Sequence, residues 1–330
     1  TLGRRGWLLL GVTVALALLA PQLLGTFWIS LLIQILVFGL LALSVDLLLG
    51  HTGIFPLGHA AFFALAAYTT AILQVRYAQP TLLAAPAGVG AAVILALVYG
   101  LAVRTSGVYF ILVTMAMGHI VWGVAQTWAS FTNGDNGIGN VPFPALGSLA
   151  IRNLSSYYYL VLAVVLACTL GYRMLTRSPF GLTLRGIRES GSRMRSLGYN
   201  VGAHRYAAFV LSGSLAGLAG VLYIYFNRFV SPPTASLHVS VEAGLMVIVG
   251  GTGTVIGPFI GSAIILVLRN YVSAYLVNWM TIMGVVFIVT VLWAPDGVLG
   301  LMRRLRAQRR MSPARSESPV VVAGEGKDTP

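Results

Sequence analysis

The sequence predicts an all-α fold, a polytopic membrane helical bundle of eight to ten transmembrane helices. Three observations predict it. Hydrophobic residues make up 57% of the 330 residues and charged residues only 9%, against about 25% charged residues in soluble domains. Apolar runs of membrane-spanning length recur along the chain, and most basic residues lie between them or near the C-terminus. A soluble fold could not cover so apolar a chain with so little polar surface, so we expect lipid to be its solvent.

Nine apolar runs approach the roughly 20 residues that a spanning helix needs. A shorter apolar piece, Val241–Val249, precedes the eighth run. The first run follows Arg4 and Arg5 as in a signal peptide, but no convincing small-residue cleavage site follows it, so we expect a retained membrane helix. The nine runs are Trp7–Leu24, Phe27–Leu49, His59–Gln74, Leu82–Val103, Val108–Trp128, Tyr157–Leu175, Tyr206–Phe226, Val255–Tyr271 and Tyr275–Trp293.

The arginines predict the orientation of the bundle. The connection Arg173–Arg205 carries seven of them, whereas Ala129–Ser156 and Asn227–Ser240 carry one each. The positive-inside rule therefore places Arg173–Arg205, the N-terminus and the basic segment Arg303–Arg310 in the cytoplasm. We expect a transmembrane domain over residues 1–302 with a cytoplasmic loop at 176–205. Residues 303–330 are basic and rich in Ser, Pro and Gly, which predicts a disordered cytoplasmic tail.

Two glycine-rich segments, Gly50–Gly53 and Gly250–Gly253, interrupt the apolar pattern. With the tail in the cytoplasm, region 241–273 must cross twice or dip in and return, so we expect a broken or re-entrant hairpin at Gly250–Gly253. Transporters often contain inverted repeats whose broken helices flank the solute site, and the two breaks make such a repeat a candidate here. Ordinary loops and close helix packing are the alternatives. The residues of these breaks that we place on the solute pathway are Thr52, Gly53, Gly250 and Gly251.

Ionisable side chains in or beside the apolar runs are the other pathway candidates, because charge at membrane depth is costly. They are Asp46, His59, His119 and Glu242. His119 shares a partly polar helix face with Met115, Trp122 and Gln126. Two alternatives stay open: the histidines could be hydrogen-bonded packing residues, and Glu242 could serve as an acid at the positive end of a helix dipole.

Other classes of chemistry find little support in the sequence. The P-loop pattern is absent and the one lysine is Lys327, so any ATP drive must come from another subunit. Most of the basic residues behind the net charge of +13 lie between apolar runs or in the tail rather than on one soluble face, which argues against nucleic acid. No His, Cys, Asp or Glu cluster has metal-ligand spacing, and no histidine is evidently placed to activate Ser212 or Ser214. We expect no catalytic residue, no metal and no cofactor.

The 176–205 loop is the most distinctive polar segment. It contains Arg177–Gly181 and reads as short amphipathic helical pieces around Leu182–Ile187 and Met194–Leu197. A solvated basic loop held by lipid headgroups would not need these interleaved apolar residues, whereas a helix laid into the groove of a partner would use them. We therefore expect this loop to dock on another protein.

Several segments between about Leu31 and Gly300 carry a resemblance to a known family, and their order and spacing together are specific. They are Leu57–Ala64, Gly107–Thr114, Thr132–Pro142, Arg177–Gly181, Arg188-Glu189, Ser196–Gly198, Phe229–Pro232, Glu242–Gly253, Gly257-Pro258 and Pro295–Gly297. On these residues the chain resembles the membrane permeases of branched-chain amino acid ABC importers, specifically the LivM-type subunit.

The resemblance implies ATP-driven import of branched-chain amino acids (leucine, isoleucine and valine) across the cell inner membrane. It implies a second, LivH-like permease subunit, two cytoplasmic ATP-binding subunits and a periplasmic or surface solute-binding protein. The 176–205 loop would then hold a coupling helix that docks on an ATP-binding subunit. The residues that the resemblance assigns to this coupling are Phe180, Gly181, Arg185, Ile187, Arg188, Glu189, Leu197 and Gly198.

The chain departs from the family pattern at three positions. Arg193 and Met194 stand in the loop where small residues are usual, and relatives often carry an acidic or polar residue at His119. Related permeases serve urea or short-chain amides, so these solutes are the alternative substrates. A secondary transporter that needs no ATPase partner is the alternative class.

Overall fold

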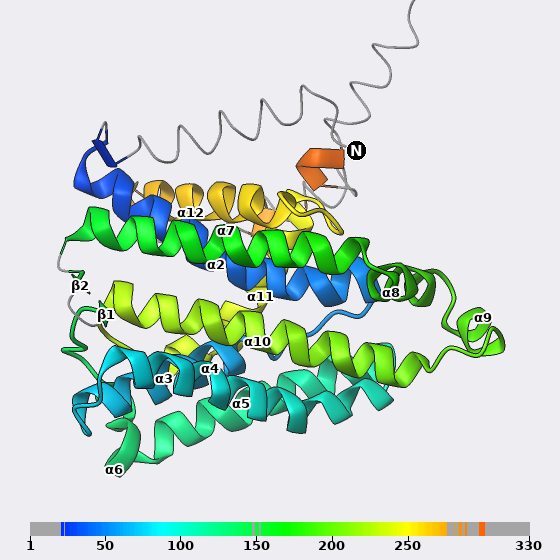
Figure 1. Ribbon diagram of the computed structural model, residues 1–330, viewed down its shortest axis with the longest axis horizontal. Helices are drawn as coiled ribbons and strands as arrows, with labels where there is room; N and C mark the ends of the chain where they lie inside the picture. The colour runs from blue at the N-terminus through cyan, green and yellow to red at the C-terminus, as the bar shows by residue number, and fades with distance from the viewer. Residues whose placement is uncertain are drawn as a thin grey trace, which may run out of the picture.

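The computed structural model describes residues 21–275, apart from residues 23, 147, 148 and 152, and the short segments 281, 284–285, 288 and 297–300. Within this part the chain is a bundle of helices with one short two-stranded hairpin (Figure 1). The α-helices are α2 (Thr26–Thr52), α3 (His59–Val75), α4 (Thr81–Tyr99), α5 (Val108–Thr127), α6 (Ala129–Thr132), α7 (Leu154–Arg177), α8 (Pro179–Glu189), α9 (Gly191–Ser196), α10 (Val201–Asn227), α11 (Leu237–Gly250) and α12 (Gly257–Tyr275). The 3-10 helices and strands are η1 (Gly100–Arg104), η2 (Gly134–Asn136), η3 (Pro232–Ala235), β1 (Ala145–Leu146) and β2 (Leu149–Ala150).

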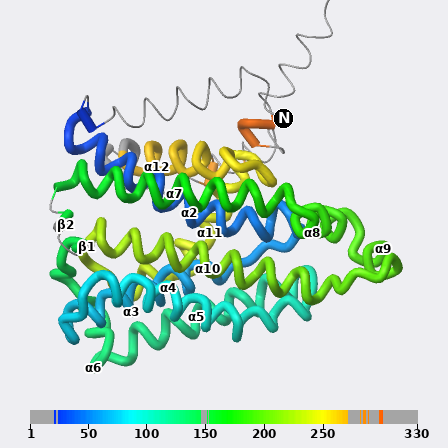
Figure 2. The backbone as a smooth tube through the Cα atoms, in the orientation of Figure 1, coloured from blue at the N-terminus to red at the C-terminus, as the bar shows by residue number. Residues whose placement is uncertain are grey.

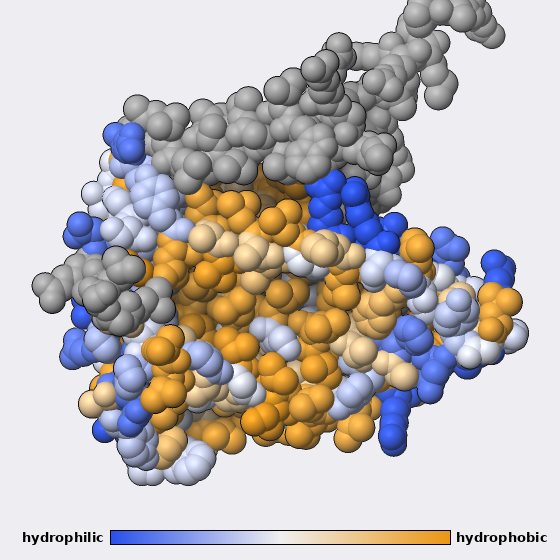
Figure 3. Space-filling model, in the orientation of Figure 1, coloured by the Kyte–Doolittle hydropathy of each residue, from blue (hydrophilic) through white to orange (hydrophobic). Residues whose placement is uncertain are grey.

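The described helices confirm the predicted polytopic membrane bundle. Five of them are long and apolar enough to cross a membrane, namely α2, α4 continued by η1, α5, α7 and α10, and three shorter apolar helices accompany them. Hydrophobic side chains cover the middle of the visible face, and hydrophilic side chains gather toward its two ends (Figure 3). This distribution suits a bundle whose middle lies in hydrocarbon. Most of the predicted runs Trp7–Leu24 and Tyr275–Trp293, and the whole 303–330 tail, lie outside the described residues.

Helices α2 and α10 lie side by side at the centre of the bundle and run antiparallel (Figure 1). Phe38 of α2 meets Tyr223 of α10 edge to face, and further along α2 the Ser44 carbonyl accepts a hydrogen bond from the Ser212 hydroxyl. The residue numbers therefore rise along one helix as they fall along the other. Both helices are largely buried. Helices α4, α7 and α12 pack against this central pair, whereas α5 packs chiefly on α3 and η3.

Small residues let α10 approach its neighbours closely. A Cβ added at Gly220 would lie 2.0 Å from the Phe63 carbonyl oxygen of α3, and one added at Gly217 would lie 2.3 Å from the Ala92 Cβ of α4. Helices in lipid gain little from burying apolar surface against one another, so close backbone packing of this kind is a main source of their association.

Each of the two central helices ends at a residue with positive φ, after which a connecting segment leads to a shorter helix. Helix α2 ends at Gly53, whose φ is 72°, and an extended segment returns into the bundle to the start of α3 (Figure 2). Helix α10 ends at Arg228, whose φ is 55°, and the segment 229–236 leads to the start of α11. The two shorter helices begin beside one another, since Ala60 N–H donates to Ser240 Oγ (2.9 Å). Because α2 and α10 are antiparallel, the two units run in opposite directions, as the predicted inverted repeat would require.

The two glycine-rich segments that the sequence pattern pairs, Gly50–Gly53 and Gly250–Gly253, lie against each other, since Gly50 contacts Gly253. The break after α2 corresponds to the one at Arg228, where an arginine rather than a glycine takes the left-handed conformation, so no glycine pattern marks it. Gly250–Gly253 instead belongs to the turn of the predicted hairpin, in which α11 and α12 pack antiparallel with Gly261 against the Met246 carbonyl.

Candidate functional site

A buried polar cluster surrounds Asp46 near the end of α2. The Asp46 carboxylate accepts one hydrogen bond from the Tyr172 hydroxyl of α7 (2.7 Å) and another from the Gly253 N–H in the α11–α12 turn (2.7 Å). His51 Nδ1 lies 3.2 Å from the Tyr172 hydroxyl oxygen. Asp46 is fully buried, and a buried carboxylate is tolerated only where its oxygens are bonded. The Asp46 cluster therefore ties α2, α7 and the α11–α12 turn together.

Arg188 of α8 joins this cluster from the predicted coupling loop. Its Nη1 donates a hydrogen bond to the Gly50 carbonyl, and its Cγ lies over Gly53, where an added Cβ would be 3.1 Å away. A carbonyl in the last turn of a helix has no partner within the helix, and a cation there also suits the negative end of the helix dipole. Arg188 thus connects α8 directly to the end of α2.

Local sequence explains why α8 forms and how it lies. Ser178 caps it by accepting a hydrogen bond from Gly181 N–H (3.4 Å), and Pro179 opens its first turn. The helix is amphipathic, and its apolar side faces the bundle. Its buried residues are Gly181, Thr183, Leu184 and Ile187, and its exposed residues include Arg185 and Glu189.

An open groove of about 530 Å³ lies where α8, α9 and the start of α10 meet. Phe180 stacks on His204 there, with ring centroids 5.7 Å apart. Leu182 of the groove lining is 59% exposed. After α9, Leu197 is 67% exposed, and Gly198 turns the chain with a φ of 86°. Exposed apolar side chains among polar ones are typical of protein interaction surfaces. The groove is lined by Pro179, Phe180, Leu182, Thr183, Gly186, Met194, Tyr199 and His204.

A cavity of about 440 Å³ lies toward the opposite end of the bundle, between α2, α3, α10, α11, α12 and η3. Its walls combine aromatic side chains with amide, hydroxyl and charged groups, a mixture typical of small-molecule sites. The lining residues are Gln34, Phe38, Phe63, Tyr223, Phe226, Asn227, Ser231, Pro233, Thr234, His238, Val239, Glu242, Arg269 and Asn270.

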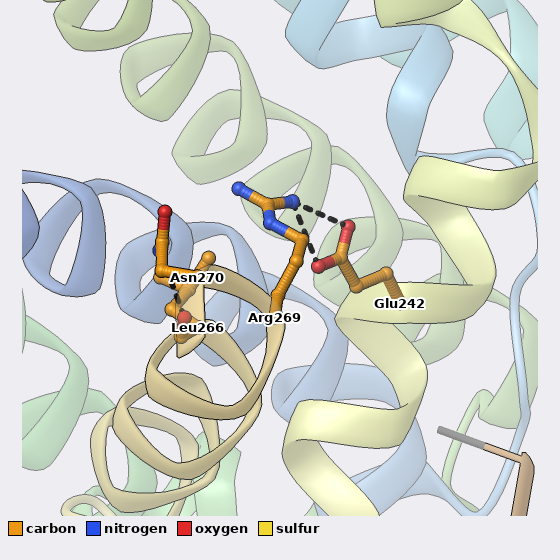
Figure 4. Close-up of polar contacts among 4 residues, drawn as sticks. All are labelled: Glu242, Leu266, Arg269 and Asn270. Atoms are coloured by element: carbon orange, nitrogen blue, oxygen red, sulfur yellow. Dashed lines mark hydrogen bonds and ion pairs between the residues drawn. The ribbon is translucent and has the colours of Figure 1, made fainter. Parts of the chain in front are cut away.

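Glu242 of α11 and Arg269 of α12 form an ion pair in the wall of this cavity (Figure 4). Arg269 Nη1 donates to both carboxylate oxygens, at 3.0 and 3.3 Å. Glu242 is 3% exposed and Arg269 is 27% exposed, and the guanidinium lies 5.5 Å from the centroid of the Phe38 ring. Charges at membrane depth are expensive and mark functional sites, so this pair is the strongest candidate for solute contact among the described residues.

His59 lies in the tightly packed interior of the bundle at the start of α3. Its Nε2 is 2.6 Å from Ser212 Oγ, and its ring meets those of Phe62 and Phe209 edge to face. The side chain is fully buried. The expectation that no histidine lies beside Ser212 is therefore wrong. Because the Ser212 hydroxyl donates to the Ser44 carbonyl, the imidazole nitrogen donates to Ser212 Oγ and does not take its proton. This is the hydrogen-bonded packing arrangement that the sequence left as the alternative for the histidines.

The remaining predicted pathway residues lie apart from the cavity. His119 is exposed on α5, with its Nδ1 3.0 Å from the Met115 carbonyl oxygen. Thr52 is buried in the last turn of α2, where its hydroxyl donates to the Leu48 carbonyl (2.7 Å). Gly250 packs against the Gly257 carbonyl, and Gly251 caps α11. The structure brings Asp46, Gly53 and Arg188 together, and it separates them from Glu242.

Among the site residues that were not predicted are Arg269 and Tyr172, which bind the carboxylates of Glu242 and Asp46. Arg269 lies inside the apolar run Val255–Tyr271. A charged residue within a membrane helix indicates a functional site, so this position in the sequence is itself a signal for Arg269. Tyr172 carries no such signal, because tyrosine is common near the ends of membrane helices. Its role follows only from the position of its hydroxyl beside Asp46.

A helical membrane bundle with a solute-sized cavity and a charged pair in its wall has the architecture expected of a membrane transport protein. Within the described residues, no group of three or more His, Cys, Asp or Glu could hold a metal ion. The chain belongs to the family described as branched-chain amino acid transport system / permease component, whose model matches residues 2–291. It is therefore an ABC transporter permease of this family.

Individual relatives agree with the family. The chain is 26% identical over 321 residues to the high-affinity branched-chain amino acid transport system permease protein LivM of Escherichia coli (strain K12), covering 90% of this chain and 75% of that protein. It is 27% identical over 293 residues to the protein of the same name from Salmonella typhimurium, covering 81% and 69%. The guanosine ABC transporter permease protein NupQ of Bacillus subtilis is 25% identical over 193 residues, covering 52% and 59%. No solved structure is a significant match.

Proposed function

We propose that the chain is the membrane-spanning subunit of an ATP-driven importer that moves leucine, isoleucine and valine across the cell inner membrane. Its partners are a second permease subunit, two cytoplasmic ATP-binding subunits and a solute-binding protein on the outer side. The observation that carries the proposal is the placement of α8. This amphipathic helix projects with α9 from one end of the bundle (Figure 1), and Arg188 binds it to the end of α2.

Contacts of α8 provide a path for mechanical coupling. Arg188 holds Gly50 on α2, and Gly253 packs against the same Gly50 carbonyl while its N–H bonds Asp46. Gly253 lies in the turn between α11 and α12, the helices that carry Glu242 and Arg269. A subunit that binds in the groove between α8 and α9 would therefore move α11 and α12, the two helices that contain the charged pair of the cavity.

The distribution of arginines supports an inner position for the α8–α9 end. Basic residues concentrate there, and at the opposite end Arg76 and Arg228 are bound to local backbone carbonyls. The arginines at the α8–α9 end are Arg104, Arg173, Arg177, Arg185, Arg188, Arg193, Arg195 and Arg205.

The cavity supports an apolar amino acid as the solute. Aromatic side chains line it beside an ion pair, and an apolar zwitterion offers matching groups of both kinds. A permease for urea or short-chain amides is the second candidate, since related proteins differ in substrate. Those solutes carry no charge and would leave the ion pair without a ligand.

Uptake by the assembled complex tests the proposal. Proteoliposomes that contain this chain, its second permease and the ATP-binding subunits, with the solute-binding protein outside, are expected to accumulate radiolabelled leucine only when ATP is enclosed. Leucine uptake by this chain alone without nucleotide would contradict the proposal and favour a secondary transporter. ATP-dependent uptake of urea with none of leucine would assign the alternative substrate.

Coupling through α8 is tested by the double substitution Arg188→Ala and Glu189→Ala. It removes the link to Gly50 and an exposed charge from the docking side, so ATP-dependent leucine uptake is expected to fall at least about tenfold. The matched control is Arg104→Ala, an exposed arginine at the same end on η1, which should keep uptake within about twofold. Unchanged uptake and ATPase association in the double variant would show that the loop does not couple.

A further inference from the structure

We infer that Glu242 and Arg269 form a zwitterion site inside the permease, where Arg269 receives the solute carboxylate and Glu242 its ammonium group. The inference rests on the proposed function and identifies the site in the membrane that recognises the solute. It assigns the aromatic wall of the cavity to the apolar side chain of the same solute.

The first observation is that the helix hairpin does not need the pair for packing. Glycines already bring α11 and α12 into backbone contact, with Gly261 beneath the Met246 carbonyl and Gly250 against the Gly257 carbonyl. Both helices are predominantly apolar. A largely buried ion pair in such a hairpin costs desolvation free energy that apolar residues would avoid.

The second observation is the geometry of the pair. A full arginine–carboxylate pair uses two nitrogens of the guanidinium in parallel hydrogen bonds. Here the single atom Nη1 makes both bonds to Glu242, and the second terminal nitrogen points away from the carboxylate (Figure 4). The guanidinium therefore keeps a donor edge that matches another carboxylate.

The third observation is the unequal exposure of the two charges. Arg269 is 27% exposed and held over Phe38, whereas Glu242 is 3% exposed. A solute that enters the cavity meets the arginine first and reaches the glutamate deeper in the wall. Hydroxyl and amide groups of Ser231, Thr234 and Asn227 line the same cavity and can bind the remaining ammonium hydrogens.

The net charge of the ion pair indicates which class of amino acid the site would bind. The pair is neutral, and a zwitterion keeps the cavity neutral while placing each charge beside an opposite one. A cationic or anionic amino acid brings an unpaired charge to membrane depth. Phe38, Phe63 and Phe226 offer an apolar wall to the side chain. The site should therefore prefer leucine-like amino acids over lysine, glutamate, nucleosides and amides.

Photolabelling of the assembled complex tests the site directly. The probe is the diazirine analogue of leucine, applied to the complex in nanodiscs, with labelled peptides mapped by mass spectrometry. We expect labels on the cavity walls of α2, α3 and α10, competed by leucine. Leucinamide, which lacks the carboxylate, and 4-methylpentanoate, which lacks the ammonium group, should compete at least about tenfold more weakly.

The decisive variant is Glu242→Gln with Arg269→Gln, which keeps the cavity neutral and so limits the risk of misfolding. Labelling should fall and the KM for leucine uptake should rise, each by about tenfold or more, while the complex still assembles. The charge-neutralising control is Arg76→Gln, at the end of the bundle beside Ser130, which should change neither value.

Two results would overturn the zwitterion site. One is unchanged labelling and KM in the double glutamine variant, and the other is competition by leucinamide equal to that by leucine. In both cases ATP-dependent leucine uptake by the wild-type complex would still support the proposed function. A wild-type complex that hydrolyses ATP and takes up no leucine would instead reject the proposed function, and the zwitterion site with it.

Discussion

At the residue scale, the described part of the chain places few polar side chains deep in the bundle and binds most of them to partners. The Asp46 carboxylate receives the Tyr172 hydroxyl and the Gly253 N–H, and Glu242 receives Arg269. A buried carboxylate that loses a donor keeps its desolvation cost without the compensating bond. Each donor around Asp46 should therefore matter to stability and to the coupling of α8 with α11 and α12.

The Tyr172→Phe substitution removes one hydroxyl and leaves the ring in place. Because it deprives Asp46 of a hydrogen bond, we expect the variant to lose about 1–3 kcal/mol of stability and to hydrolyse more ATP per leucine imported. Thermal unfolding of the purified complex and the ratio of ATP hydrolysed to leucine transported measure these effects.

The matched control is Tyr68→Phe on α3. Tyr68 is also buried, and its hydroxyl has no hydrogen-bond partner among the described residues. Loss of an unpartnered hydroxyl should be close to neutral or slightly stabilising. Equal effects of the two substitutions would show that the Tyr172–Asp46 bond has no particular role.

At the element scale, α10 packs closely against several of its neighbours. It packs against α2, α3 and α4, and the contact with α3 requires that residue 220 have no side chain. A Cβ there would meet the backbone carbonyl of Phe63 at 2.0 Å, and backbone cannot move aside as a flexible side chain can. Helix packing, rather than helix formation, is therefore the step that is sensitive to sequence here.

Gly220→Ala tests this dependence. We expect it to destabilise the bundle by about 1–3 kcal/mol through overpacking of α10 against α3, seen as a lower unfolding temperature in detergent. Gly171→Ala on α7 is the control, because a Cβ at Gly171 meets nothing within 4 Å and alanine favours the helix. A Gly220→Ala variant as stable as Gly171→Ala would contradict the packing described here.

Element positions were largely predictable because lipid imposes the length of an apolar run. The run Val108–Trp128 corresponds to α5, Val108–Thr127, and Tyr157–Leu175 lies inside α7. The break at Arg228 could not be predicted, because an arginine gives no signal for left-handed backbone. Glu242 could be found as a lone intramembrane charge, but its pairing with Arg269 depends on how α11 folds back on α12.

At the scale of the whole molecule, contacts run from one end of the bundle to the cavity near the other. They begin at α8, pass through Arg188 and Gly50 to Gly253, and continue along α11 and α12 to the charged pair. In the proposed importer this path converts movement of a cytoplasmic ATP-binding subunit into rearrangement of the cavity walls. For this conversion, α8 must face the cytoplasm and touch that subunit.

Site-directed labelling of Glu189→Cys in the full complex, with the native Cys168 changed to serine, tests this requirement most directly. If α8 faces the cytoplasm, a membrane-impermeant thiol reagent should label position 189 only from the cytoplasmic side. The ATP-binding subunit should protect this position, and a short cross-linker should join the two. Asp135→Cys, in η2 at the opposite end, should label only from the outside. Labelling of position 189 from the outside, or full reactivity in the assembled complex, would contradict the account.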